Sequence, residues 1–383
     1  MSAQSYMREA GPMNQGTTRY VGMDVHKATI TVALAEAGGQ PVLYGTIVND
    51  PGAVRKLARQ LGREARLVVA YEAGPTGYAL HRQLTELGVD CMVVAPSLIP
   101  RRTGDRVKTD NRDAVTLARL LRSGDLTPVW VPGEADEALR DLVRARFDAK
   151  ADVLRAKHRL SKFLLRHGLE PPPGTKAWTA RYQAWLNQLR FPQAAAQVVF
   201  DDYRATVRAA EDRIRRLEVE LRGCAQDSRQ AALIAALQAL RGIGLLSAVT
   251  IAAETGDLRR FARARGFMSF TGLTSSEHSS GPSHHRGGIT HTGNSYLRHV
   301  LVQAAHNARH APSRSWQLKQ RQAGLPPDLV EQAWRAQLRL HQRYRHLVGR
   351  LGRPKAVTAV ARELAGFVWA IGQRMAEQEV SAA

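Results

Sequence analysis

Two aspartates, Asp110 and Asp113, are the residues whose type and spacing most directly suggest chemistry. They precede a run, 114–121, whose apolar residues recur at helical spacing. Side chains three apart share a helix face, so the two carboxylates would project together from the first turn. Like charges this close repel unless a cation, usually a divalent metal, lies between them. Acids in a first turn are, however, also favoured by the helix dipole alone.

Two further acids, Asp24 and Glu72, occupy positions where a purely structural role is hard to justify. Asp24 lies within or at the end of a predicted strand, and Glu72 ends an apolar run, 67–72. A charge inside an apolar strand is costly unless it is paired or bound to a metal. Four carboxylates at one sheet edge would suit two Mg²⁺ (or Mn²⁺) ions and a phosphodiester. We therefore predict a metal-dependent phosphoryl-transfer site.

The elements that must position these acids follow a mixed α/β pattern. Alternation and β-branched residues predict a strand within 20–34, clearest in 28–34, and further strands at 42–48, 67–72 and 91–94. Helical spacing predicts helices at 51–61, 76–87 and 114–121. Together these segments predict an α/β sheet domain.

The charge of the chain indicates a polyanionic partner. Its 383 residues carry a net charge of +21, whereas residues 1–100 hold nine Lys and Arg against eight Asp and Glu. A nearly neutral N-terminal segment followed by a strongly basic remainder is typical of nucleic-acid-binding proteins, although a basic protein without such a partner would carry the same charge. No apolar run is long enough to span a membrane and no signal peptide is evident. The two cysteines, Cys91 and Cys224, indicate neither disulfides nor a zinc site, so we expect a cytoplasmic protein.

Basic helices and a heptad pattern follow the sheet domain. Nine Lys and Arg in 140–166 form either a solvated face or a surface that tracks a nucleic-acid backbone. After a break at 171–174, Trp178, Tyr182 and Trp185 follow at spacings of four and three, which favours packing over base stacking. Apolar residues from Tyr203 to Leu221 alternate at spacings of four and three, which predicts a coiled-coil arm, either an internal hairpin or a dimer contact.

Gly242 and Gly244 lie in a Gly-Ile-Gly turn between two helical stretches. Such a turn can present backbone N–H groups to a phosphate at a helix N-terminus, and it resembles a helix-hairpin-helix, a module that binds the DNA backbone. A plain tight turn between helices explains the pattern equally well.

A second chemical signal lies in 270–298, a stretch rich in serine, glycine, histidine and arginine. Ser280 precedes Gly281, and a serine beside glycine can approach a phosphate closely. Arg286 and Arg298 could neutralise the phosphate as charge develops during attack. The histidines fit no usual zinc spacing, so a zinc site is not expected: His278, His284, His285 and His291.

Three motifs in order carry a family resemblance: 22–27, 72–77 and 108–114. They resemble the N-terminal domain of the DEDD transposases of bacterial insertion sequences, which are related to Piv-type DNA invertases. The resemblance implies a ribonuclease-H-like (RuvC-like) fold, with Asp24, Glu72, Asp110 and Asp113 as its four acids.

The serine-rich stretch resembles the C-terminal transposase domain of the same family. The resemblance implies that Ser280 is the nucleophile, with Ser279 as the fallback. Ser275 stands where the family usually has proline, which would loosen the loop. The implied domains are a disordered tail at 1–18, a RuvC-like domain at 19–168, a linker and coiled coil at 169–230, a transposase domain at 231–310 and C-terminal helices at 311–383.

The expected function is that of a DNA transposase that forms a phosphoserine intermediate with help from the metal-binding acids. The resemblance further implies element-end and target DNA, a structured guide RNA and a dimer or tetramer, in a bacterial nucleoid. The predicted nucleic-acid contacts are Lys108, Arg112, Gly242, Gly244, Arg286 and Arg298. The alternatives are a Holliday-junction-type nuclease that uses water without a covalent intermediate, and a binding protein with structural acids.

Overall fold

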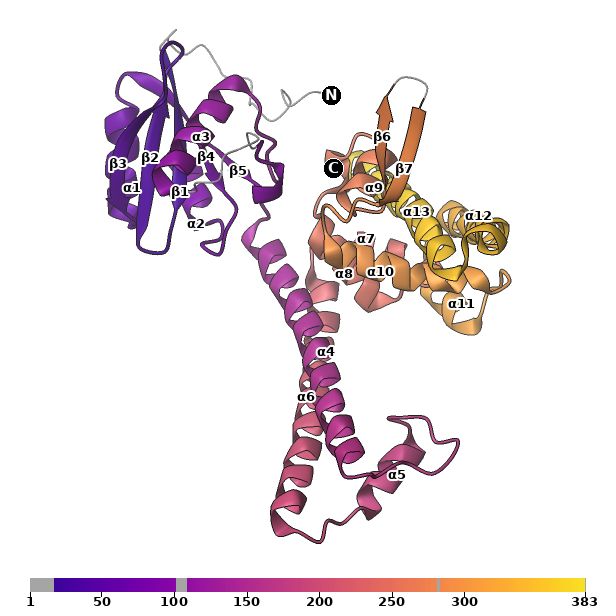
Figure 1. The fold of residues 1–383 in the computed structure, drawn as a ribbon. Coiled ribbons are helices and arrows are strands. Elements are labelled where there is room, and N and C mark those ends of the chain that lie inside the picture. Colours follow the sequence, from indigo (N-terminus) through magenta and orange to yellow (C-terminus); the bar gives the residue numbers. More distant parts are fainter. Residues whose placement is uncertain (1–16, 101–108, 281–282, 383) are drawn as a thin grey trace. The chain divides into compact units, whose positions relative to one another are not determined.

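The computed structural model describes residues 17–100, 109–280 and 283–382. The chain divides into two compact units, one ending at Val131 and the other beginning at Pro132 (Figure 1). The predicted first domain, 19–168, extends past this division into the long helix that opens the second unit. The predicted tail, 1–18, overlaps the first strand by two residues, Thr17 and Thr18.

A five-stranded sheet forms the centre of the first unit, in the order β3-β2-β1-β4-β5 (Figure 1). β1 is parallel to β4, β4 is parallel to β5, and β2 is antiparallel to both of its neighbours. The predicted mixed α/β sheet is thereby confirmed. The strands are β1 (Thr17–Val25), β2 (Thr29–Ala35), β3 (Val42–Val48), β4 (Ala65–Glu72) and β5 (Asp90–Val94).

One strand was predicted within 20–34, but this segment contains most of two strands, β1 and β2. β1 and β2 form a hairpin whose turn includes His26, and the His26 backbone N–H donates to the Thr29 carbonyl over 2.9 Å. The turn, Val25-His26-Lys27-Ala28, contains no glycine, proline, asparagine or aspartate. It therefore lacks the residues by which turns are usually recognised in a sequence.

Helices cover both faces of the sheet. α1 (Pro51–Leu61) and α2 (Ala79–Glu86) bury Leu57 and Leu84 against Val21 and Met23 of β1. α3 (Asp110–Ser123) covers the opposite face, and a short 3₁₀ turn, η2 (Pro96–Leu98), follows β5. Because side chains alternate along a strand, β1 presents its odd-numbered residues to α1 and α2 and its even-numbered residues to α3.

Small residues let α3 lie very close to β1. A Cβ atom at Gly22 would fall 2.2 Å from the Ala114 carbonyl oxygen and 2.4 Å from the Ala118 nitrogen. Ala114 and Ala118 are themselves buried against Ala33 and Ala35 of β2. Gly22 therefore sets the distance between the strand that carries Asp24 and the helix that begins at Asp110.

The second unit begins with an arm of two long helices, α4 (Glu134–Arg166) and α6 (Ala194–Asp227), which lie side by side (Figure 1). α5 (Ala180–Gln188) lies between them in sequence. The predicted apolar positions of α6 face α4: Val207 packs with Leu160 and Phe163, and Leu221 packs near Val143. The heptad segment thus forms an internal helical hairpin, while a coiled-coil supercoil remains a prediction.

Aromatic side chains pack against one another at the end of the arm that carries α5 (Figure 1). Trp178 and Trp185 each contact Tyr182, with ring centroids 5.3 and 5.2 Å apart, and Tyr182 is buried. The prediction that these aromatics serve in packing is confirmed.

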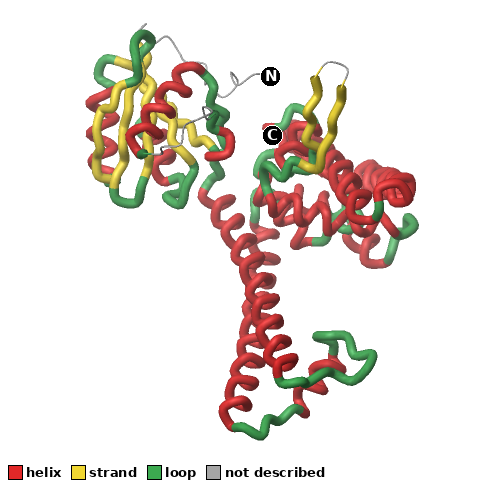
Figure 2. Tube along the Cα trace, in the orientation of Figure 1, coloured by secondary structure: helices red, strands yellow, loops and turns green. Residues whose placement is uncertain are grey.

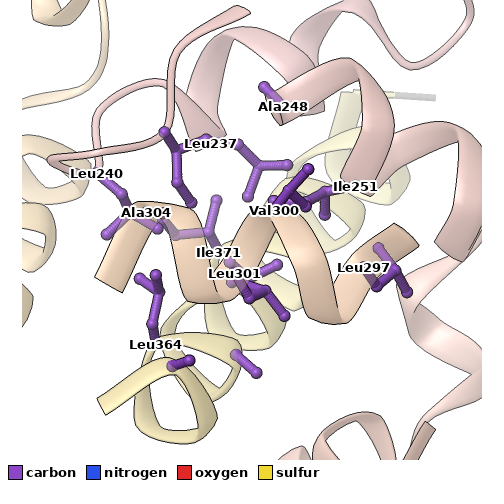
Figure 3. Close-up of a cluster of buried hydrophobic side chains, with 14 of the residues drawn as sticks. Leu237, Leu240, Ala248, Ile251, Leu297, Val300, Leu301, Ala304, Leu364 and Ile371 are labelled. Carbon is purple, nitrogen blue, oxygen red and sulfur yellow. The ribbon is translucent and has the colours of Figure 1, made fainter. Parts of the chain in front are cut away.

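The remainder of the second unit is a helical body with one two-stranded ribbon (Figure 2). Its core joins α7, α8, α10 and α13 through side chains such as Leu237, Ile251, Leu301 and Leu364 (Figure 3). None of the described helices is long and apolar enough to cross a membrane. The elements are α7 (Ala231–Leu237), α8 (Leu245–Thr255), η3 (Leu258–Arg260), α9 (Ala264–Phe270), β6 (Ser275–Ser280), β7 (Ser283–Ile289), α10 (Ser295–Ala305), η4 (His306–Arg309), α11 (Trp316–Gln322), α12 (Pro327–Leu351) and α13 (Arg353–Ala382).

Candidate active site

Asp24 lies near the end of β1, on the face of the sheet that α3 covers. Its side chain is 19% exposed, and burial raises the pKa of its carboxyl above the ordinary value. The nearby carboxylates of Asp110 and Asp113 raise this pKa further, whereas His26 lowers it. Burial and the neighbouring acids thus disfavour the ionised form of Asp24, and a cation bound beside the carboxylate would favour it.

The first turn of α3 brings Asp110 and Asp113 to this face. Thr109 is the N-cap residue: its hydroxyl accepts from the Arg112 backbone N–H over 3.4 Å, and its carbonyl accepts from the Asp113 N–H over 3.0 Å. Cap and helix together place both carboxylates beside the end of β1. The prediction that these aspartates begin a helix is confirmed.

His26 lies between two of the acids. Its Nε2 atom is 3.3 Å from Oδ2 of Asp24 and 3.4 Å from Oδ2 of Asp110. One ligand atom from each of these three residues lies within 4.8 Å of the other two, which suits a single metal ion. The sequence motif contained His26, but an exposed histidine in an unrecognised turn gave no signal of a role.

Glu72 ends β4 on the same side of the sheet. The parallel register pairs Met23 with Tyr71, so Asp24 and Glu72 each follow the last paired residue of adjacent strands. The carboxylates of Glu72 and Asp113 nevertheless lie outside the group of three ligand atoms within 4.8 Å. We call Asp24, Asp110 and Asp113, together with His26, the acid cluster. Glu72 lies beside it.

Two cations, Arg112 and Lys108, are predicted near these acids. Arg112 is exposed on the first turn of α3, one residue before Asp113. Lys108 lies outside the described residues.

Ser280 lies at the end of a polar ribbon formed by β6 and β7, strands that the sequence did not indicate. It pairs with Ser283 and is exposed, and the following Gly281 lies outside the described residues. Ser279 is also exposed, and its hydroxyl donates to Oε1 of Glu277 over 2.9 Å. Ser275 begins β6, and the first residue of a strand is one of the few strand positions at which proline is found.

The two arginines predicted to assist Ser280 lie on different elements, Arg298 on α10 and Arg286 on β7. Arg298 of α10 donates from Nη1 to the Thr271 carbonyl over 3.0 Å, which fastens the segment leading into the ribbon. Arg286 lies on β7 in the pair with Glu277, and its side chain is outside the described part of the chain.

The Gly-Ile-Gly turn is explained at Gly242 by packing. Gly242 adopts φ +91°, and a Cβ atom there would lie 2.5 Å from the Ala304 carbonyl oxygen. Gly244 is the N-cap residue of α8. The buried Ile243 between them offers its carbonyl to Arg321 Nη1 over 2.6 Å.

Several basic residues of α4 are paired with acids of the protein. Arg144 binds Glu254 of α8 through two hydrogen bonds of 2.8 and 2.9 Å, and Arg140 lies 3.9 Å from the same carboxylate. Arg146 pairs with Glu218 over 2.6 Å. These pairs favour an internal role for this part of the basic run.

Two family matches cover the segments that carry the predicted acids and the serine-rich ribbon. Residues 21–168 match a transposase family of the IS110 DEDD type, and residues 234–320 match the transposase IS116/IS110/IS902 family. The first match spans the strands and helix that carry the four predicted acids. The second spans the ribbon.

Curated relatives align over nearly the whole chain. A putative transposase y4qE of Sinorhizobium fredii is 42% identical over 94% of this chain and 90% of its own length. The transposase for insertion sequence element IS1533 of Leptospira borgpetersenii is 34% identical over 86% of this chain and 96% of its own length. The chain therefore belongs to the IS110 family of insertion-sequence transposases.

Proposed function

We propose that this protein cuts and rejoins the DNA of an insertion sequence, with a divalent metal, Mg²⁺ or Mn²⁺, held by the acid cluster and Glu72. The observation that carries the proposal is the convergence of Asp24, His26 and Asp110, whose ligand atoms all lie within 4.8 Å of one another. Oxygen-rich sites of this kind suit such metals, which polarise phosphodiesters.

The strand order supports a ribonuclease-H-like fold for the first unit. An antiparallel β3-β2-β1 meander continues into parallel β4 and β5, and α3 covers the face that carries Asp24. Acids from two parallel strands and one helix N-terminus would then surround one scissile phosphate.

Ser280 would act as the nucleophile. Its Oγ would form a bond to phosphorus as the bond to the leaving sugar oxygen breaks, with the serine proton passing to water and the leaving oxygen taking a proton in turn. The phosphoserine link keeps the strand joined to protein, so a new DNA hydroxyl can displace the serine without another energy source. The exposure of Ser280 at the ribbon end leaves it accessible to DNA.

The second unit would supply much of the nucleic-acid contact. No Asp or Glu occurs between Glu277 and Asp328, whereas six Lys and Arg do. In this stretch Trp316 is 73% exposed, and an exposed indole among cations suits base stacking. Arg112, Lys108, Gly242, Gly244, Arg286 and Arg298 remain proposed contacts.

The proposal extends, on the family resemblance, to a structured guide RNA and to a dimer or tetramer in which acids and serine come from different subunits. The net charge of +21 suits DNA and RNA alike.

A trapping experiment tests the serine mechanism. Full-length protein would be incubated with labelled element-end DNA, the RNA transcribed from the element flank and Mg²⁺, and then denatured. We expect a covalent protein–DNA adduct that is lost in Ser280→Ala and in Asp110→Asn but kept in Ser279→Ala. Glu86→Gln, an exposed acid on α2, is the matched control.

The rival function, a metal-dependent junction nuclease that uses water, is favoured by one observation. The acid cluster belongs entirely to the first unit and could activate water without the serine. DNA cleavage without an adduct, surviving Ser280→Ala, would establish this rival. An adduct that persists in Ser280→Ala and disappears in Ser279→Ala would move the nucleophile to Ser279.

A further inference from the structure

We propose that His26 is itself a ligand, binding the metal through Nε2 beside Asp24 and Asp110. The site would then have mixed nitrogen and oxygen donors. This inference rests on the proposed function, because it concerns the metal that the acid cluster is proposed to hold.

The spacing of the three donor atoms supports direct ligation. Ligands about 2.1 Å from one metal lie about 3.0 Å apart at adjacent octahedral corners and about 3.4 Å apart at tetrahedral corners. The Nε2 atom of His26 is 3.3 Å from the Asp24 oxygen and 3.4 Å from the Asp110 oxygen. These separations agree with neighbouring positions on one ion and are longer than the usual N–H···O hydrogen bond.

The backbone around His26 is held on both sides. Its N–H donates to the Thr29 carbonyl over 2.9 Å, and its carbonyl accepts from Asn49 Nδ2 over 2.8 Å. Asn49 follows β3 directly, so two strand ends fix the turn that presents the imidazole. With its backbone fixed, the histidine loses little further freedom when it binds a metal.

A purely electrostatic role for His26 is the competing explanation. A cationic imidazole between two carboxylates would offset their repulsion and would be displaced by an incoming metal. A ligand must instead be neutral at Nε2 and must remain in the first coordination shell after the metal binds. The two roles therefore differ in where His26 lies in the metal-loaded protein.

A nitrogen donor has a consequence for metal choice. Imidazole suits transition metals, whereas Mg²⁺ and Ca²⁺ favour oxygen ligands. A site with His26 should therefore prefer Mn²⁺ to Mg²⁺ more strongly than one made of the acids and Glu72 alone.

Electron spin-echo envelope modulation on the Mn²⁺-loaded full-length protein tests this directly. We expect ¹⁴N modulation from a bound imidazole in the wild type and in His158→Ala, an exposed histidine of α4 that serves as the control. The modulation should disappear in His26→Ala and in His26→Asn, which keeps a side-chain oxygen donor. The Mn²⁺ affinity should fall at least about 10-fold in His26→Ala, with a smaller loss for Mg²⁺.

Bound Mn²⁺ without ¹⁴N modulation in the wild type, or modulation that persists in both His26 variants, would overturn the His26 inference alone. In that case Asp110→Asn should still weaken Mn²⁺ binding, and the proposed function would stand. An Mn²⁺ affinity unchanged in Asp24→Asn and Asp110→Asn would instead overturn both, because the acid cluster would not hold the metal.

Discussion

The acid cluster of the first unit and a second group around Glu254 both gather charged side chains from distant parts of the sequence. Glu254 is completely buried, yet it receives two hydrogen bonds from Arg144 and one of 2.7 Å from Asn294, with Arg140 nearby. We call these four residues the Glu254 cluster. Its carboxylate is surrounded by donors, whereas the acid cluster holds three carboxylates beside one histidine.

This difference separates a structural ion pair from a proposed reactive site. Burying a charge is tolerable when partners satisfy it, so the Glu254 cluster can join α4, α8 and the start of α10. In the acid cluster, by contrast, the half-buried Asp24 lies beside two further carboxylates that raise its pKa, and a bound metal would offset this repulsion. The predictions below test this contrast, beginning with the largest expected effect.

Asp24→Asn should abolish strand cleavage. Loss of a metal ligand removes several kcal/mol of transition-state stabilisation, which corresponds to a rate loss on the order of 10³-fold or more. Cleavage of labelled element-end DNA under single-turnover conditions measures the loss, with Glu86→Gln as the control. A loss of less than about 10-fold would place Asp24 outside the reaction.

Glu254→Ala should destabilise the second unit strongly. It leaves the buried Arg140 without its carboxylate, and breaking a buried ion pair costs about 3–5 kcal/mol. Denaturant unfolding followed by intrinsic fluorescence measures this change. Glu331→Gln, which removes only an exposed pair with Arg335, should change stability by less than about 1 kcal/mol. Equal effects of the two variants would contradict the assignment.

Gly22→Ala should destabilise the first unit by about 1–3 kcal/mol and weaken Mn²⁺ binding. The added methyl group would overlap the Ala114 carbonyl oxygen and push α3 away from β1, which separates Asp110 from Asp24. Thermal unfolding and Mn²⁺ titration measure the two effects. Gly38→Ala is the control because no atom lies within 4 Å of its added Cβ. Unchanged metal binding in Gly22→Ala would show that α3 does not set the site.

The smallest expected effect is a pH dependence of the metal-free protein. Burial first, and then Asp110 and Asp113, raise the folded-state pKa of Asp24. Its contribution to stability is therefore fully present below the ordinary Asp pKa of about 3.9 and is lost as pH rises through the folded-state pKa. The melting temperature of Asp24→Asn relative to wild type should rise across this range.

Mn²⁺ should reverse that difference at neutral pH, because it stabilises only the folded protein that can bind it. A constant difference between Asp24→Asn and wild type at every pH, with or without Mn²⁺, would contradict the electrostatic account.

The positions of the acids in the fold could largely be predicted from the sequence because their signals are local. Asp110 and Asp113 open a helix with regular apolar spacing, and Glu72 ends a continuous apolar strand. The hairpin of β1 and β2 was missed because its turn carries no turn-favouring residue, and His26 was overlooked with it.

The second unit was harder to predict for two reasons. Some of its ion pairs join residues far apart in the sequence, and its ribbon has no apolar face that would mark the strands. Arg144 and Glu254 are 110 residues apart, so the basic run of α4 gave no sign of its internal partner. The β6–β7 ribbon is built largely of serine, histidine and glycine, which have little strand propensity, and no apolar alternation marks it. The apolar residues of α6 recur regularly enough to predict that this helix packs against another one. That the partner is α4 of the same chain is evident only from the structure.

The most direct test of the central claim is a Mn²⁺ titration, followed by electron paramagnetic resonance, of the wild type and of the double variant Asp24→Asn/Asp110→Asn. We predict saturable Mn²⁺ binding in the wild type and its loss in the double variant, whereas Glu254→Gln, which alters the Glu254 cluster, retains it. Equal binding in the wild type and the double variant would contradict the claim that these acids form a metal centre.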